Sequence, residues 1–188
     1  MYPIKLDLST LTNGDGYNFA VTMQYIKKII YYMSYYETTY GEIIDTTTLY
    51  SIINIYIKDS ISYNFYDFGS GYGKIVIEYQ NKFKNCYGIE LVKDRHMIAI
   101  SKNYYNNVHL INDNFFNISL QNQYVLLINN LCLGEGTQKR LGLKILDTPK
   151  DNNIILVTKK INSLEKYYID FYLLECSWGY SEIYFYKY

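Results

Sequence analysis

The residues of this sequence most suited to chemistry form a glycine-rich turn that begins at an acidic residue. The turn reads Asp67-Phe68-Gly69-Ser70-Gly71-Tyr72-Gly73. An alternating aromatic stretch over 61–65 predicts a strand before it, and an apolar run over 75–79 predicts the start of a helix after it. Glycines allow positive φ and let backbone N–H groups approach a ligand closely. A strand, an acidic residue, glycines and a helix in this order predict a nucleotide-binding turn.

A second acidic residue follows at a distance that suits a ribose contact. Glu90 ends a short predicted strand over 86–90 and lies 17 residues after Gly73. The glycines are spaced G-x-G-x-G, unlike the G-x-G-x-x-G of dinucleotide sites. A carboxylate at the end of this strand can accept hydrogen bonds from both hydroxyls of a ribose. The turn and Glu90 together therefore predict an adenosine-binding site, for which the turn alone would be weak evidence.

Alternating strands and helices along the chain predict the scaffold of this site. Helices are predicted over 17–33, 47–58, 93–105 and 138–146, with Asp45 capping the second, and strands over 61–65, 86–90, 108–111, 124–128 and 154–157. Two more strands, within 167–176 and 182–188, predict an antiparallel pair at the sheet edge. This order is typical of a doubly wound α/β domain. We expect a single domain over 1–188, with an N-terminal arm, helix and loop over 1–45 and a core over 46–188.

Composition limits the classes of function. The chain has 188 residues, of which 49% are hydrophobic and 19% charged, as in a globular domain. Its formal net charge of zero argues against strong non-specific binding to DNA or RNA. The 25 tyrosines could form a base-stacking surface. Because they are spread over the whole chain, the coding bias of an AT-rich genome explains them more simply.

The cysteines and histidines carry no metal or redox signature. Cys86, Cys132 and Cys176 stand alone in apolar contexts, which predicts buried thiols in a reducing compartment. His96 and His109 lack metal-ligand spacing. Neither a signal peptide nor an apolar run of membrane length is recognised, so we expect a soluble, intracellular protein without membrane association.

Further short motifs, in register with the turn and Glu90, resemble one group of enzymes. With Asp113 after the third strand and the closing antiparallel pair, the chain is similar to class I S-adenosylmethionine-dependent methyltransferases. The motifs Tyr40-Gly41-Glu42, Asn129-Asn130 and Ser177-Trp178 resemble, more specifically, the non-SET histone-lysine methyltransferases of the disruptor-of-telomeric-silencing family. This resemblance implies a Rossmann-like class I methyltransferase fold, with a mostly parallel seven-stranded sheet and a C-terminal antiparallel pair.

The resemblance covers roughly residues 35–188 and implies S-adenosyl-L-methionine as the cofactor. The turn would hold the methionine end, Glu90 the ribose, and Asp113 the adenine amino group. The residues assigned to the cofactor in this way are Tyr36, Glu37, Tyr40, Glu42, Asp67, Gly69, Gly71, Glu90, Asp113, Phe115 and Asn129. Replacing Glu90 with Ala is expected to abolish or greatly weaken cofactor binding and to leave the fold intact, because it removes charge-assisted bonds to two hydroxyls.

The resemblance also implies a channel for a lysine side chain. Asn129 would sit where cofactor and channel meet, and Trp178 and Phe185 would line the channel, which makes these three the implied catalytic residues. Methyl transfer from a sulfonium needs alignment and a dry channel rather than a strong nucleophile from the protein. Neutralising a lysine of ordinary pKa at pH 7 costs about 4.6 kcal/mol, and an apolar channel lowers that pKa. The structural alternatives are Asn129 as a cap and Trp178 as an edge anchor.

These patterns lead to one predicted function with open alternatives. We predict a protein-lysine methyltransferase that acts on a histone or nucleosome and binds bare DNA weakly. There are two alternatives: a class I methyltransferase for another protein, RNA or a small molecule, and a non-catalytic cofactor-binding subunit.

Two details of the sequence bear on the acceptor. Phe185 departs from the tyrosine usual in the family at that position. A predicted helix carries Lys139, Arg140 and Lys144, a candidate recognition patch that a solvated helix face explains more simply.

Overall fold

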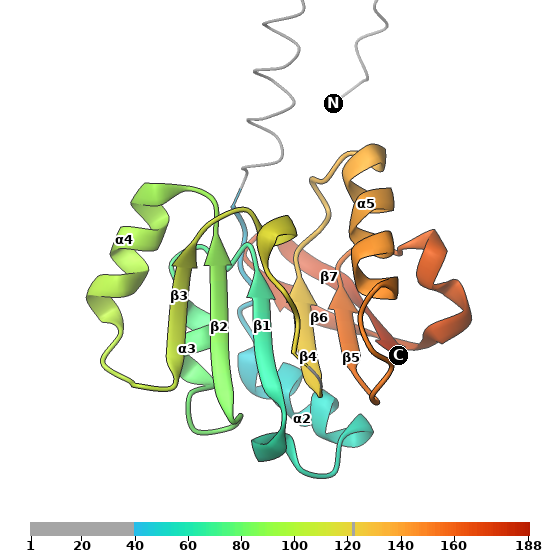
Figure 1. Cartoon of the computed structure of the whole chain (residues 1–188), viewed down its shortest axis with the longest axis horizontal. Helices are drawn as coiled ribbons and strands as arrows, with labels where there is room; N and C mark the ends of the chain where they lie inside the picture. The colour runs from blue at the N-terminus through green and yellow to red at the C-terminus, as the bar shows by residue number, and fades with distance from the viewer. Residues whose placement is uncertain (1–39, 122) are drawn as a thin grey trace, which may run out of the picture. The chain divides into compact units, whose positions relative to one another are not determined.

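The computed structural model describes residues 40–121 and 123–188, which belong to one compact unit over 38–188. Its strands are β1 (Asn64–Phe68), β2 (Asn85–Glu90), β3 (Val108–Asn112), β4 (Tyr124–Ile128), β5 (Ile154–Val157), β6 (Tyr168–Cys176) and β7 (Gly179–Lys187). They form one seven-stranded sheet in the order β3-β2-β1-β4-β5-β7-β6 (Figure 1). Neighbours from β3 to β5 are parallel, whereas β7 is antiparallel to both β5 and β6. The predicted sheet with its closing antiparallel pair is confirmed.

Three expectations cannot be compared with the structure. The helix predicted over 17–33 and the loop residues Tyr36 and Glu37 lie outside the described residues. The single domain over 1–188 therefore stays a prediction.

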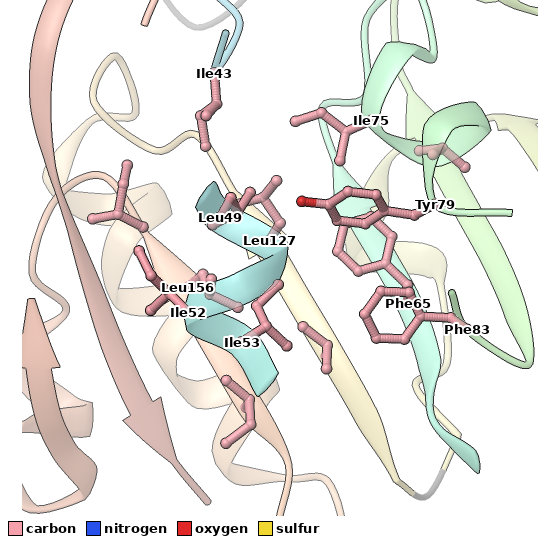
Figure 2. Close-up of a cluster of buried hydrophobic side chains, with 14 of the residues drawn as sticks. Ile43, Leu49, Ile52, Ile53, Phe65, Ile75, Tyr79, Phe83, Leu127 and Leu156 are labelled. Atoms are coloured by element: carbon pink, nitrogen blue, oxygen red, sulfur yellow. The ribbon is translucent and has the colours of Figure 1, made fainter. Parts of the chain in front are cut away.

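Helices cover both faces of the sheet. They are α2 (Thr46–Tyr56), α3 (Lys74–Glu78), α4 (Lys93–Lys102) and α5 (Glu135–Leu146), with 3-10 turns η2 (Ser60–Ser62), η3 (Phe115–Asn117) and η4 (Asn162–Tyr167). Helices α2 and α3 pack on one face, and α5 with η4 packs on the other (Figure 1). Figure 2 shows Leu49, Ile52 and Ile53 of α2 beside Leu127 and Leu156 of the sheet. Each fully buried Leu or Ile stabilises this packing by about 1.5–3 kcal/mol.

The two central strands are buried on both faces. All five side chains of β4 are buried, as its continuous apolar run predicts. All five of β1 are buried too, but this strand begins at Asn64 rather than at residue 61, because Ser60–Ser62 forms a 3-10 turn. The aromatic alternation that suggested 61–65 therefore marks the entry to the strand. Asp67 consequently lies within β1, as its penultimate residue.

Other element boundaries differ from the prediction by a few residues. Strand β7 begins at Gly179 rather than at 182, since Gly179 takes a φ of +113° and allows a tight connection from β6. Helix α4 ends at Lys102 rather than at 105, and α5 begins at Glu135 rather than at 138. The predicted cap of α2 is confirmed, because the Asp45 side chain accepts a hydrogen bond from the Thr48 amide (3.0 Å).

The cysteines are free thiols, as predicted. Cys86 and Cys176 are buried and Cys132 is half-buried. Burial raises the pKa of the Cys86 thiol to about 12, so this cysteine is unreactive at neutral pH. Within the described residues, no helix has both the length and the apolar character needed to cross a membrane. The same part of the chain contains no group of three His, Cys, Asp or Glu side chains that could hold a metal ion.

Candidate functional site

The glycine turn connects β1 to α3 at the carboxyl edge of the sheet. Gly69, Gly71 and Gly73 have φ values of +88°, +54° and +74°, a region that other residues rarely adopt. A Cβ atom on Gly71 would also lie 1.7 Å from the Tyr40 ring. The turn therefore requires these glycines for its backbone conformation, and Gly71 also for the close approach of Tyr40.

A pocket opens beside this turn, and Asp67 is its most unusual residue. The pocket is lined by Tyr40, Gly41, Glu42, Ile43, Asp67, Gly69, Ser70, Lys74, Ile75, Leu127 and Asn129. Asp67 is only 7% exposed, and no donor from the described residues makes a hydrogen bond to its carboxylate. Desolvation, followed by the nearby Glu90 and Glu42, raises the pKa of Asp67 to about 7. Such a carboxylate favours a ligand that brings a positive charge.

Glu90 ends β2 and binds the backbone of the glycine turn. Its side chain is buried, and Oε2 accepts a hydrogen bond from the Gly71 amide (2.9 Å). Oε1 accepts from the Val92 amide (2.7 Å) and from Nη2 of Arg95 (3.0 Å). Arg95 in turn lies 5.4 Å from the centre of the Tyr40 ring. Glu90 therefore has a structural role that the sequence did not indicate, and its contact with a ribose stays a prediction.

The loop that begins at Tyr40 lies over the turn. The Tyr40 ring packs edge-on to Tyr72 (4.9 Å between centroids), and its hydroxyl donates to Glu42. Burial, reinforced by the bond to Glu42, raises the pKa of Tyr40 well above its ordinary value, so the phenol is neutral. The loop is anchored to the hairpin between β6 and β7: the Glu42 amide donates to Ser177 Oγ (3.0 Å), and the Ser177 amide donates to the Glu42 carbonyl (2.8 Å).

The motifs Tyr40-Gly41-Glu42 and Ser177-Trp178, which are far apart in the sequence, thus meet beside the pocket. The Trp178 ring lies so close to Gly41 that a Cβ there would be 2.5 Å from it, and Trp178 is 41% exposed. The Asn129 side chain donates to the Gly41 carbonyl (3.1 Å) and accepts from the Thr158 hydroxyl (3.0 Å). The structure therefore brings Tyr40, Glu42, Asp67, Gly69 and Asn129 to one pocket, with Trp178 beside it.

Phe185 lies elsewhere. It is fully buried in the core, and its ring contacts Tyr56 (5.6 Å) and Tyr172 (5.3 Å). It is absent from the residues that line the pocket. Ile183 and Phe185 point inward together, so Phe185 belongs to the buried face of β7. The place in a lysine channel that the resemblance implies for Phe185 stays a prediction.

The two residues expected near adenine follow β3. Asp113 Oδ1 accepts from the Asn114 amide (2.6 Å) and from the Asn117 side chain (2.8 Å). Phe115 stacks on Phe68 at the end of β1, with 5.1 Å between ring centroids. Phe115 is thus placed next to the glycine turn, although the pocket described above does not extend to it.

The cations of α5 support this same segment. Lys144 Nζ donates to the carbonyls of Phe116 (3.1 Å) and Ile118 (2.5 Å). The Arg140 guanidinium lies 4.2 Å from the centre of the Phe116 ring. Two of the three residues in the candidate recognition patch therefore hold the chain around η3, and Lys139 remains exposed.

Sequence reasoning missed a polar network next to Asn129. Asn130 is fully buried, and its side chain donates to Gln138 (2.7 Å) and to the Lys159 carbonyl (2.8 Å). The Lys159 amide donates to Asn130 Oδ1, and the Thr158 hydroxyl lies within hydrogen-bond distance of the same oxygen (3.2 Å) as well as of Asn129 Oδ1. Only the parallel pairing of β4 with β5 reveals this network, because it brings Asn130 to Thr158 and Lys159, which follow it by 28 and 29 residues.

Replacing Asn130 with Ala is expected to destabilise the fold by about 2–4 kcal/mol, because several buried polar groups lose their partner at once. Urea denaturation would measure this change. Asn54, on the exposed side of α2, provides a matched control whose replacement with Ala should cost less than about 0.5 kcal/mol. An Asn130→Ala protein as stable as the control would show that the network contributes little.

Comparison with known proteins identifies the fold. No protein-family model matches the sequence, and no curated protein matches it. Magnesium protoporphyrin IX methyltransferase (ChlM) from Synechocystis PCC 6803, solved with bound SAM, has a similar structure: the TM-score is 0.59 at 13% identity, covering 76% of this chain and 78% of that chain. The fold is that of the class I methyltransferases.

Enzymes with different acceptors share this fold. An RNA methyltransferase from Salinibacter ruber, in complex with S-adenosyl-L-homocysteine, has a TM-score of 0.56 at 16% identity, covering 74% of this chain and 90% of that chain. A dimethyladenosine transferase from Plasmodium falciparum has a TM-score of 0.54 at 10% identity, covering 75% of this chain and 62% of that one. Structural similarity at identities this low establishes the fold and does not identify the acceptor.

Proposed function

We propose that this chain binds S-adenosyl-L-methionine at the glycine turn and transfers its methyl group. The observation that carries the proposal is the buried Asp67 carboxylate, which faces a pocket of the class I methyltransferase fold without a donor from the described residues. The ammonium group of a methionine end would supply the missing charge. When bound, the cofactor supplies an activated methyl group on a sulfonium.

The other residues of the site fit the same ligand. Among the described residues, the Gly71 amide alone donates to Glu90 Oε2, which leaves a lone pair of this oxygen for a ribose hydroxyl. Phe115, stacked on Phe68, offers an aromatic surface for adenine. Tyr40 and Glu42, tied to the β6–β7 hairpin, would close the pocket over the methionine end.

For the acceptor we propose a lysine side chain of a protein, with a histone or nucleosome as the partner. Support comes from the resemblance of three motifs to the non-SET histone-lysine methyltransferases, and from the meeting of Asn129, Gly41 and Trp178 at one place. The half-exposed Trp178 ring would exclude water from the target amine and favour its neutral form. Asn129, whose amide is fixed by Gly41 and Thr158, would orient the reacting groups.

A labelled-methyl transfer assay on free histones, nucleosomes, RNA and small-molecule acceptors tests this function. We expect label in histone lysines. Replacing Asn129 with Ala should lower kcat by about tenfold or more and leave the Kd for S-adenosylhomocysteine within about threefold, because an interaction used in the transition state affects turnover rather than ground-state binding.

The acceptor classes give distinct outcomes. Label in RNA and none in any protein would reject the lysine acceptor and keep the methyltransferase. Tight binding of S-adenosylhomocysteine without transfer to any acceptor would favour a non-catalytic cofactor-binding subunit. An Asn129→Ala variant with unchanged kcat would remove Asn129 from the reaction.

A further inference from the structure

The pocket contains one cation for which the function above has no role. Lys74 is the first residue of α3, follows the glycine turn directly, and lines the pocket as a half-buried side chain. Across residues 40–121 and 123–188, no carboxylate lies within 4.0 Å of its ammonium group, and the ion pair found there joins Arg95 to Glu90. A lysine that lines a pocket and has no counter-ion among the described residues favours an anion in the same pocket.

Lys74 shares the pocket with a carboxylate that also has no partner among the described residues. Asp67 has no hydrogen-bond donor from the described residues, and its charge is opposed by Glu90 and Glu42 rather than relieved by Lys74. The two opposite charges are therefore held apart within one pocket instead of neutralising each other. A ligand that carries one cationic and one anionic group, as a free α-amino acid end does, would satisfy both.

We propose that Lys74 binds the α-carboxylate of the cofactor's methionine end, while Asp67 binds its ammonium group. This inference rests on the proposed function, and it goes beyond it by assigning Lys74, which neither the motifs nor the fold identified. Lys74 thereby selects ligands with an intact amino-acid end. Its long, flexible stem lets a single ammonium group reach the carboxylate from the start of α3.

Ligands that differ in this one group separate the contribution of Lys74 from all others. Isothermal titration would measure the Kd of S-adenosylmethionine, of its decarboxylated form, and of 5′-methylthioadenosine, which lacks the amino-acid end. Wild-type protein should prefer S-adenosylmethionine to the decarboxylated form by roughly tenfold to a hundredfold, the range of a charge-assisted hydrogen bond. Lys74→Met should remove this preference, and Lys74→Arg should keep most of it.

Two controls exclude indirect effects. Lys102→Met removes the same charge close to the turn, 5.6 Å from the Tyr72 ring but outside the pocket, and should keep the wild-type preference. The Kd of 5′-methylthioadenosine should be the same for Lys74→Met and wild type, which also shows that the variant is folded.

Each contrary result has its own meaning. A Lys74→Met protein that still prefers S-adenosylmethionine to its decarboxylated form would overturn the role of Lys74 and leave the proposed function standing. Equal weakening of all three ligands would also overturn it, because the effect would then be structural. Wild-type protein that binds none of the three would reject the proposed function itself.

Discussion

Replacing Asp67 with Asn is expected to abolish cofactor binding and, at pH 8, to stabilise the folded protein. The folded-state pKa of Asp67 is raised to about 7, from an ordinary value of 3.8. The stability that protonated Asp67 contributes is therefore fully present below pH 3.8, and it is lost as the pH rises through about 7. Above pH 7 the ionised carboxylate opposes folding, and its removal should add about 2–4 kcal/mol to the free energy of unfolding.

Urea denaturation at pH 4.5 and pH 8 measures this effect, which should be small at the lower pH. Titration with S-adenosylhomocysteine at pH 8 should show a loss of affinity of about a hundredfold or more, because a buried charge pair with the ligand is removed. For wild-type protein the same affinity should fall as the pH drops below 7 and Asp67 takes up a proton.

Asp45→Asn is the matched control, because the same substitution there should have the opposite sign. Hydrogen bonds to Thr48 lower the pKa of Asp45, so its ionised form supports the helix cap. An Asp67→Asn protein that is less stable than wild type at pH 8 would show that Asp67 is already paired. Unchanged affinity for S-adenosylhomocysteine would remove it from the binding site.

Asp67 illustrates which parts of the site the sequence could predict. A glycine turn after an acidic strand residue is a local pattern, so the spacing of Asp67, Gly71 and Glu90 was sufficient to place them at one edge of a parallel sheet. The environment of Asp67 also depends on Glu42 and on the loop at Tyr40, which is held beside it by contacts with the hairpin at Ser177 and with Asn129. The raised pKa could not be predicted without those contacts.

The fold was predictable for a similar reason, and Phe185 shows where prediction ended. Continuous apolar runs identify buried parallel strands such as β4 regardless of which face each residue occupies. On β7 the aromatic residues 184, 185 and 186 are consecutive, so composition does not reveal which face of the sheet each of them occupies. Pairing with Leu156 and the contact with Tyr56 place Phe185 in the core on the face covered by α2.

Glu90→Ala is expected to cost both cofactor binding and stability, whereas the sequence alone suggested that the fold would stay intact. The Glu90 carboxylate holds the amides of Gly71 and Val92 and pairs with Arg95, whose side chain is only 17% exposed. Removing this carboxylate takes a buried ion-pair partner from Arg95 and the acceptor from two amides, so we expect a loss of about 3–5 kcal/mol. Thermal and urea denaturation would measure it, with S-adenosylhomocysteine titration on the protein that remains folded.

A second pair of variants separates the structural role of Glu90 from its proposed contact with the ribose. Glu90→Gln keeps the size of the side chain but removes the charge that pairs with Arg95. This variant should therefore be less stable than wild type. Adding Arg95→Met removes the positive charge of Arg95, so the double variant should recover part of the lost stability. It should still bind S-adenosylhomocysteine at least about tenfold more weakly than wild type, because a neutral amide replaces the charge-assisted bonds to the ribose hydroxyls. A double variant with wild-type affinity would mean that Glu90 holds the glycine turn and makes no contact with the cofactor.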